Sequence, residues 1–125
     1  METRLFPAQR SDVCRDSVLL GPSEHAIPAS LVDTAIAARL ARVFQALSDP
    51  TRVRIISLLL EHELCVHTST EALGMQQSAV SHQLRTMRDM RLVRARKDGR
   101  HVYYTLDDRH IGDLFRQGLA HSQHL

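Results

Sequence analysis

After residue 30, apolar residues recur at three- and four-residue spacing through most of the chain, which predicts a largely helical domain. The first such segment, Leu31 to Leu47, carries its apolar residues on one helix face. A second helix is predicted from about Pro50 to Leu60, because Asp49 can cap it and Pro50 fits the first helical position. Residues 1–30 contain three prolines and lack this periodicity, so we expect a flexible tail followed by a domain over residues 31–125.

A short helix, a tight turn and a longer helix are predicted next. Thr68-Ser69-Thr70-Glu71 matches the capping box that begins a helix, and Gly74 is placed to end that helix. The longer helix runs from about Gln77 to Met90 and has an apolar stripe of Val80, Leu84 and Met87. Its opposite side is polar and offers Gln77, Ser78, Ser81, His82 and Arg85. This order is typical of a helix-turn-helix, whose second helix enters the major groove of DNA.

Two strand-like runs follow the second of these helices. The runs are Leu92-Val93-Arg94-Ala95-Arg96 and His101 to Leu106, and between them lies Lys97-Asp98-Gly99-Arg100. An Asp-Gly pair between two strands favours a two-residue hairpin turn. A last helix is predicted from Asp107 to about His124. The expected fold is therefore mainly α with a small β-hairpin: a winged helix-turn-helix in which the basic hairpin is the wing.

Positive charge is concentrated around this wing. The chain has a formal net charge of +2, yet seven Arg and Lys against two Asp between residues 85 and 100 give that segment +5, which leaves −3 for the rest. Such a segment favours an anionic partner such as nucleic acid. Nearly all the basic residues are Arg, which suits phosphate and guanine contacts. The expected DNA contacts beyond the helix are Arg96, Lys97 and Arg100.

Composition limits the other function classes. The longest apolar stretch, Ile55 to Leu60, is too short to span a bilayer, and residues 1–7 lack the apolar run of a signal peptide. We therefore expect a cytoplasmic protein without a membrane partner, in which Cys14 and Cys65 are reduced. The sequence offers no nucleophile–base constellation, so we expect neither an enzyme nor a small-molecule substrate.

Four metal-type ligands stand near the C-terminus, as Asp108-x-His110 and His121-x-x-His124. On a helix His121 and His124 share a face. The eleven residues from His110 to His121, at about 1.5 Å each, separate the two pairs by roughly 16 Å. A tetrahedral site needs its ligands about 2 Å from one ion, so on a continuous helix one pair must come from a second chain. The alternative is a set of solvated polar residues on a surface helix.

Several motifs together resemble the ArsR/SmtB family of metal-sensing repressors, and its zinc-sensing branch most closely. The resemblance covers about residues 31–125 and rests on Glu63-Leu64-Cys65-Val66, on Ser78 to Arg85, on Gly99 to Tyr104 and on the ligand spacing. It implies a winged-helix homodimer whose first and last helices form the interface. It further implies that the apo dimer binds operator DNA near a metal-efflux or sequestration gene, and that metal releases it.

The resemblance also implies site residues. Asp108 and His110 of one subunit would join His121 and His124 of the other around Zn(II), with Co(II) as an alternative because the set has one negative charge. The polar residues of the longer helix would face DNA, although relatives often have Ser or Thr where this chain has Gln76. A second site, from Cys14, Cys65 and His67, would suit the soft ion Cd(II). The alternative for these cysteines is an apolar buried thiol and an unengaged tail residue.

Two other functions match parts of the pattern. A winged-helix regulator could lack metal control, or could respond to redox state through Cys14 and Cys65. A zinc hydrolase would use the same four ligands, but four protein ligands leave no open position for a water molecule. The ligand count therefore favours a regulatory or structural site over a catalytic one.

Overall fold

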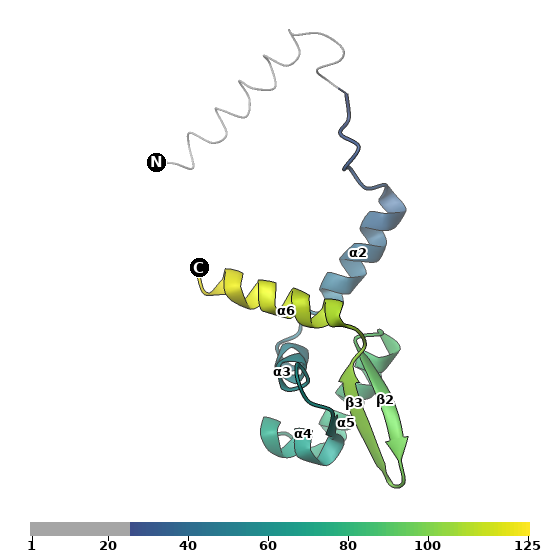
Figure 1. Cartoon of the computed structure of the whole chain (residues 1–125), viewed down its shortest axis with the longest axis vertical. Helices are drawn as coiled ribbons and strands as arrows, with labels where there is room; N and C mark the ends of the chain where they lie inside the picture. Colours follow the sequence, from purple (N-terminus) through teal and green to yellow (C-terminus); the bar gives the residue numbers. More distant parts are fainter. Residues whose placement is uncertain (1–25) are drawn as a thin grey trace. The chain divides into compact units, whose positions relative to one another are not determined.

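The computed structural model describes residues 26–125, and its elements follow the predicted order (Figure 1). The helices are α2 (Thr34–Ala46), α3 (Pro50–Leu58), α4 (Val66–Leu73), α5 (Gln77–Asp89) and α6 (Arg109–Ser122). The strands are β1 (Leu64–Cys65), β2 (Val93–Asp98) and β3 (His101–Leu106). They form one antiparallel sheet in the order β1-β3-β2. The mainly helical fold with a small hairpin is confirmed, while Cys14 and most of the expected tail lie outside the described residues.

Local capping explains where the first two helices begin. The Asp33 side chain accepts a hydrogen bond from the Ile36 backbone nitrogen at 2.8 Å, so α2 begins at Thr34 and not at Leu31. The Asp49 carboxylate accepts from the Arg52 backbone nitrogen at 3.0 Å, and proline occupies the first turn of α3 as predicted. Helix α3 ends at Leu58, two residues before the predicted end.

The predicted start of α4 was wrong. The helix begins at Val66, and the residues of the expected capping box lie inside it. Cys65 pairs with Tyr103 in β1 and occupies the N-cap position with extended backbone, but its side chain makes no cap hydrogen bond. The Ser69 hydroxyl instead donates to the Cys65 carbonyl oxygen at 2.9 Å. Gly74 ends α4 in the left-handed region, φ +66°, as predicted.

The sheet differs from the predicted hairpin in two ways. Strand β1 is a third strand that was not predicted. It has only two residues, which is too short to show the alternation of polar and apolar residues that indicates a strand. The hairpin turn is Gly99-Arg100, one residue later than predicted, because Asp98 still pairs with His101 in the ladder. Gly99 has a φ of +62°, and a glycine at the first central position is typical of a type II′ turn.

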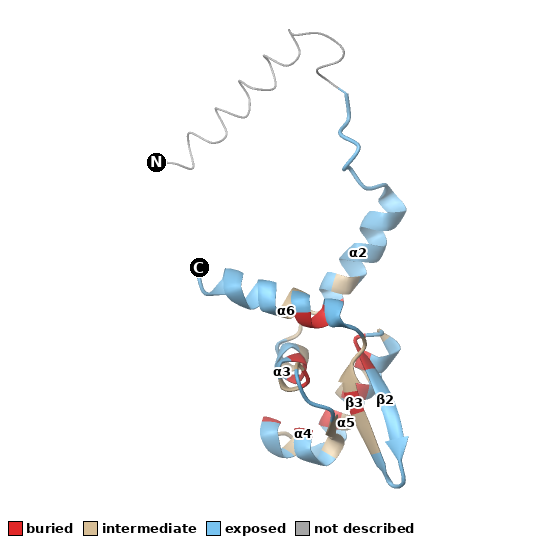
Figure 2. Ribbon diagram, in the orientation of Figure 1, coloured by how far each residue is buried: buried red, intermediate tan, exposed pale blue. Residues whose placement is uncertain are grey.

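The core lies where α3, α4, α5, the sheet and the first turn of α6 meet (Figure 2). The predicted stripe of α5 is fully buried, with Val80, Leu84 and Met87 at 0% exposure. Helix α5 is thereby fixed to the body by one face, and its opposite face stays outside. The other buried hydrophobic residues are Ala46, Ile55, Ile56, Leu59, Leu73, Leu92, Val93, Tyr104 and Ile111.

Candidate metal centre and nucleic-acid interface

The first ligand pair is assembled at the start of α6. Asp108 is the N-cap residue, and its Oδ1 accepts a hydrogen bond from the His110 backbone nitrogen at 2.9 Å. The His110 ring nitrogen Nδ1 lies 3.3 Å from the same oxygen. Slight burial raises the pKa of Asp108, but the hydrogen bonds from His110 lower it by more, so the pKa lies below its usual value. Both side chains are at least half exposed, so an ion could reach an ionised carboxylate and an imidazole here.

The second pair lies at the other end of α6. The helix ends at Ser122, so the predicted end at about His124 was too late. The helical turn nevertheless continues, because Gln123 keeps right-handed helical backbone angles and the His124 backbone nitrogen donates to the His121 carbonyl oxygen at 3.0 Å. His121 and His124 therefore share one side of the chain, and both are exposed.

The two pairs remain apart within one chain. Helix α6 is continuous from Arg109 to Ser122, and across residues 26–125 no three His, Cys, Asp or Glu side chains converge on a point that could hold an ion. A four-ligand site built from these residues therefore needs a second copy of the chain.

An apolar groove lies along the same helix. It has a volume of about 460 Å³ and is lined by Phe44, Leu47, Val53, Ile56, Leu114, Phe115, Gly118, Leu119 and Ser122. Large side chains at its rim are exposed: Phe44 by 52% and Leu119 by 46%. Contiguous exposed apolar surface of this kind marks an interaction face.

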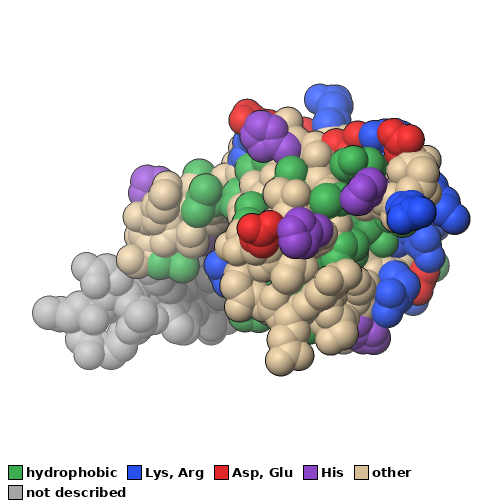
Figure 3. All heavy atoms as spheres, turned by 90° about the horizontal axis from the view of Figure 1, so that it is seen from below, with side chains coloured by type: hydrophobic (Ala, Val, Ile, Leu, Met, Phe, Trp, Pro, Cys, Tyr) green, Lys and Arg blue, Asp and Glu red, His purple; other side chains and the backbone are tan. Residues whose placement is uncertain are grey.

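The polar face of α5 lies outside, as predicted. Gln77, Ser78, His82 and Arg85 are exposed, and Ser81 is half-buried. Gln76 occupies the N-cap position with extended backbone but makes no side-chain cap hydrogen bond. Figure 3 shows Lys and Arg side chains gathered on the side of the molecule that carries the hairpin. The polar face of α5 and the nearby basic side chains offer the hydrogen-bond donors and positive charge that bind DNA bases and phosphates.

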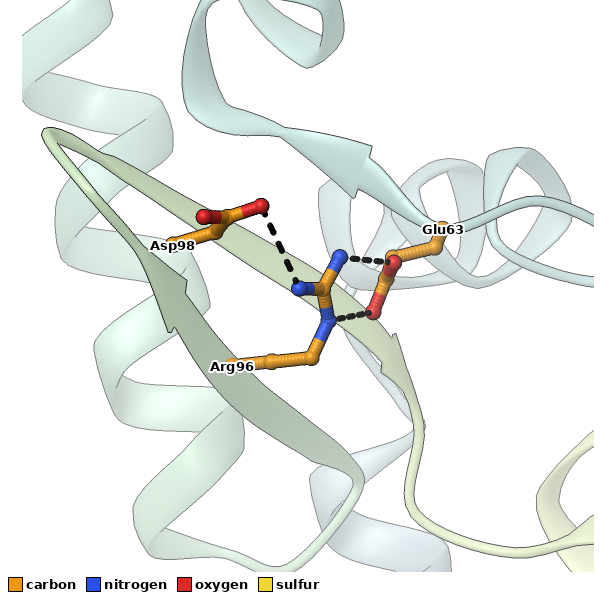
Figure 4. Close-up of polar contacts among 3 residues, drawn as sticks. All are labelled: Glu63, Arg96 and Asp98. Carbon is orange, nitrogen blue, oxygen red and sulfur yellow. Dashed lines mark hydrogen bonds and ion pairs between the residues drawn. The ribbon is translucent and has the colours of Figure 1, made fainter.

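The wing residues fall into two groups. Lys97 and Arg100 are exposed near the hairpin turn, and their role as phosphate contacts stays a prediction. Arg96 differs, because its guanidinium is bound within the chain by Glu63, with Nη2 to Oε1 at 2.6 Å and Nε to Oε2 at 3.0 Å (Figure 4). Sequence reasoning placed Glu63 in a family motif but missed this pairing, since 33 residues separate the partners.

The expected second metal site is not assembled in the described part of the chain. Cys65 Sγ lies 3.5 Å from Thr68 Oγ1, and this hydrogen bond is the largest cause of a lowered pKa for the Cys65 thiol. His67 lies in the first turn of α4 and pairs with Glu71 at 2.9 Å. Cys65 and His67 could converge on an extended chain, but the helix begins between them. The four-residue spacing of His67 and Glu71 could have indicated their pairing.

No helix within residues 26–125 is long and apolar enough to cross a membrane.

Comparison with known proteins gives consistent matches. The profile described as "Bacterial regulatory protein, arsR family" matches residues 49–95. A transcriptional repressor SmtB homolog of Synechocystis sp. is 47% identical over 87 residues, which cover 70% of this chain and 66% of the relative. The HTH-type transcriptional regulator NmtR of Mycobacterium tuberculosis is 42% identical and covers 78% and 82%. A cadmium resistance transcriptional regulatory protein CadC homolog of Staphylococcus aureus is 40% identical and covers 67% and 70%.

Solved structures match as well. The solution structure of apo-NmtR superposes with a TM-score of 0.67 at 40% identity, over 84% of this chain and 88% of that one. A homodimeric winged helix-turn-helix DNA-binding domain of Mycobacterium bovis, described as a possible ArsR-family transcriptional regulator, gives 0.67 at 28% identity, over 77% and 91%.

Proposed function

The chain belongs to the ArsR family of bacterial regulatory proteins, and on that premise we propose that it is a metal-responsive transcriptional repressor. Its apo dimer binds operator DNA, and metal binding at the dimer interface releases the DNA. The observation that carries the proposal is the arrangement of α6, which has one ligand pair at each end and the apolar groove along its length. Dimerisation and metal binding thus use the same helix.

The dimer part of the proposal rests on the groove. Two copies related by a two-fold axis would cover each other's exposed apolar side chains on α2 and α6. Burial of such surface contributes about 25 cal/mol per Å² before the costs of association. The homodimeric winged-helix domain of M. bovis supports this assembly.

The metal centre we propose has two equivalent copies in each dimer. Asp108 and His110 of one subunit join His121 and His124 of the other, because an antiparallel arrangement of α6 brings opposite ends together. One carboxylate and three imidazoles suit tetrahedral Zn(II), and Co(II) accepts the same donors. A carboxylate has two oxygens, so Asp108 can cap the helix through Oδ1 and still offer Oδ2 to an ion.

The metal acts on DNA binding through the orientation of the subunits. Asp108 lies two residues after β3, and the Asp107 backbone nitrogen donates to the Leu92 carbonyl oxygen at 2.9 Å, which joins the start of α6 to the start of the wing. The same turn of α6 packs against the body, since a Cβ at Gly112 would be in ordinary contact with Leu60 at 3.4 Å and with Leu106 at 3.6 Å. Because α6 is held firmly to the DNA-binding body, a change in how two α6 helices cross would move both recognition helices together.

The function is tested with a duplex that the wild-type apo dimer selects from a random-sequence pool. Zinc should weaken binding to this duplex by roughly 5- to 150-fold, which corresponds to typical allosteric couplings. Linkage requires that the duplex weaken zinc binding by the same factor, which calorimetry can measure independently. Equal affinity of the apo and zinc-loaded dimers for the duplex would reject the mechanism.

A cadmium titration tests the second site that the sequence predicts. If Cys14 and Cys65 both bind Cd(II), ultraviolet thiolate-to-metal absorption should appear, and Cys14→Ser or Cys65→Ser should each reduce it. Each backbone residue that metal binding has to fix costs about 1–2 kcal/mol, so we expect a site that uses Cys14 to be weaker than the helical one. The second site would be rejected if zinc still releases DNA fully from Cys65→Ser and if cadmium gives no absorption band with the wild type. Regulation would then depend on the ligands at the two ends of α6 alone.

A further inference from the structure

The Arg96 guanidinium is held on three sides within the chain. Its Nε and Nη2 form the bidentate pair with Glu63, and its Nη1 lies 3.7 Å from Asp98 (Figure 4). The Arg96 Cζ lies over the Tyr103 ring, 5.0 Å from the ring centroid. A bidentate arginine–carboxylate pair has the most specific geometry that an ion pair can adopt.

The register of the sheet shows what this ion pair joins. Arg96 on β2 and Cys65 on β1 are both opposite Tyr103 on β3, so the three side chains form one row on one sheet face. Glu63 lies two residues before Cys65. The ion pair therefore passes over the central strand and links β2 to the residue that directly precedes β1. Strand β1 has only two residues, and the pair adds a side-chain tie between this segment and the wing.

The same ion pair changes what Arg96 can offer to DNA. The Nε–Nη2 edge of the guanidinium, one of the two edges that can form paired hydrogen bonds with a phosphate, is occupied by the Glu63 carboxylate. The hydrogen bond from Arg96 lowers the pKa of Glu63, so the carboxylate stays ionised at neutral pH. Two acidic groups around one cation leave no surplus of positive charge at this point of the wing. Lys97 and Arg100 are exposed as Arg96 is, but within residues 26–125 neither forms an ion pair.

We propose that Arg96 is a positioning residue: paired with Glu63, it anchors the wing to the strand before α4, and thereby sets where Lys97 and Arg100 meet the DNA backbone. The inference rests on the proposed DNA-binding function. Glu63 is then as important for DNA affinity as Arg96, although its own charge repels phosphate.

The test compares Glu63→Gln, Arg96→Gln and the double variant, as full-length dimers, on the duplex selected by the wild type. Each single variant should weaken binding by up to about fivefold per subunit, or roughly 25-fold per dimer, as expected for a well-aligned ion pair. The double variant should be no weaker than either single one, because both substitutions break the same ion pair. The slope of log affinity against log salt should not change, since the dimer still neutralises the same number of phosphates.

Other results would overturn the proposal. A lower salt slope in Arg96→Gln, by about 0.9 for each phosphate that the variant no longer neutralises, would show that Arg96 binds DNA directly. Tighter binding by Glu63→Gln would show that Glu63 masks Arg96 from phosphate. Unchanged affinity in all three variants would show that the anchor has no role in binding.

A charge exchange separates anchoring from a simple loss of structure. The variant carrying Glu63→Arg and Arg96→Glu should recover most of the wild-type affinity if the pair acts as an anchor, and should bind worst if residue 96 faces phosphate. Glu61→Gln is the matched control for the removed negative charge, and should bind DNA no more weakly than the wild type. If the wild type itself selects no duplex, the proposed function fails; if it binds and the variants behave otherwise than expected, the anchor alone is rejected.

Discussion

Raising the salt concentration from 50 to 200 mM should lower the affinity of the apo dimer for DNA by roughly 10³- to 10⁵-fold, if the dimer neutralises about six to ten phosphates. The cations available for this are clustered: Arg85 is exposed on α5, and Lys97 and Arg100 are exposed near the hairpin turn. Each neutralised phosphate releases condensed counterions, so affinity falls linearly with salt on logarithmic scales. Fluorescence anisotropy of a labelled duplex at several salt concentrations measures the slope.

The double variant Lys97→Gln/Arg100→Gln assigns part of that slope to the wing. It removes two cations from each wing, and the slope should fall by up to about 3.6 if each of these four cations of the dimer neutralises one phosphate. Arg109→Gln/Arg116→Gln is the matched control, because it removes the same charge from α6, where both arginines lie near Asp113. An unchanged slope in the wing variant, or an equal decrease in the control, would contradict the assignment of the hairpin as a DNA-contacting wing.

The features that could be predicted from the sequence are those that depend on residues close together along the chain. Three such features follow from spacings of a few residues, and each is found in the structure. They are the apolar stripe of Val80, Leu84 and Met87, the helix cap at Asp49 and the helix end at Gly74. The correct helix order then favoured the winged helix-turn-helix fold.

What could not be predicted depends on interactions between distant residues. Strand β1 exists because Leu64 and Cys65 pair with β3 almost 40 residues later, and this pairing also moved the start of α4 away from the expected capping box. The Glu63–Arg96 ion pair also joins residues far apart in the sequence, and no local pattern distinguishes Arg96 from Lys97 and Arg100 of the same hairpin, which are unpaired within the described part of the chain. Of the proposed metal site, each ligand pair could be recognised from its spacing, but joining the pairs needs a second chain.

Mixing two inactive variants should restore zinc binding, and this is the sharpest test of a metal site shared between subunits. One variant loses Asp108 and His110 by substitution with Ala, and the other loses His121 and His124. A homodimer of either variant has only two of the four ligands at every interfacial site. A heterodimer has one complete site, made from the pair that each subunit retains, and one site with no ligand.

Zinc affinity should therefore be nearly abolished in each variant alone and should return in the mixture, at one ion per heterodimer. The partners are unfolded together and refolded, tagged differently so that the heterodimer can be isolated, and titrated with Co(II) to detect the intense visible absorption of tetrahedral coordination. A control mixture, in which both subunits lack His121 and His124, should bind no ion. Recovery is expected only if the two ends of α6 meet across the interface, because within one chain the pairs stay roughly 16 Å apart on a continuous helix. An ion bound by either variant alone with tetrahedral geometry, or a heterodimer that binds none, would show that Asp108, His110, His121 and His124 do not form the shared site.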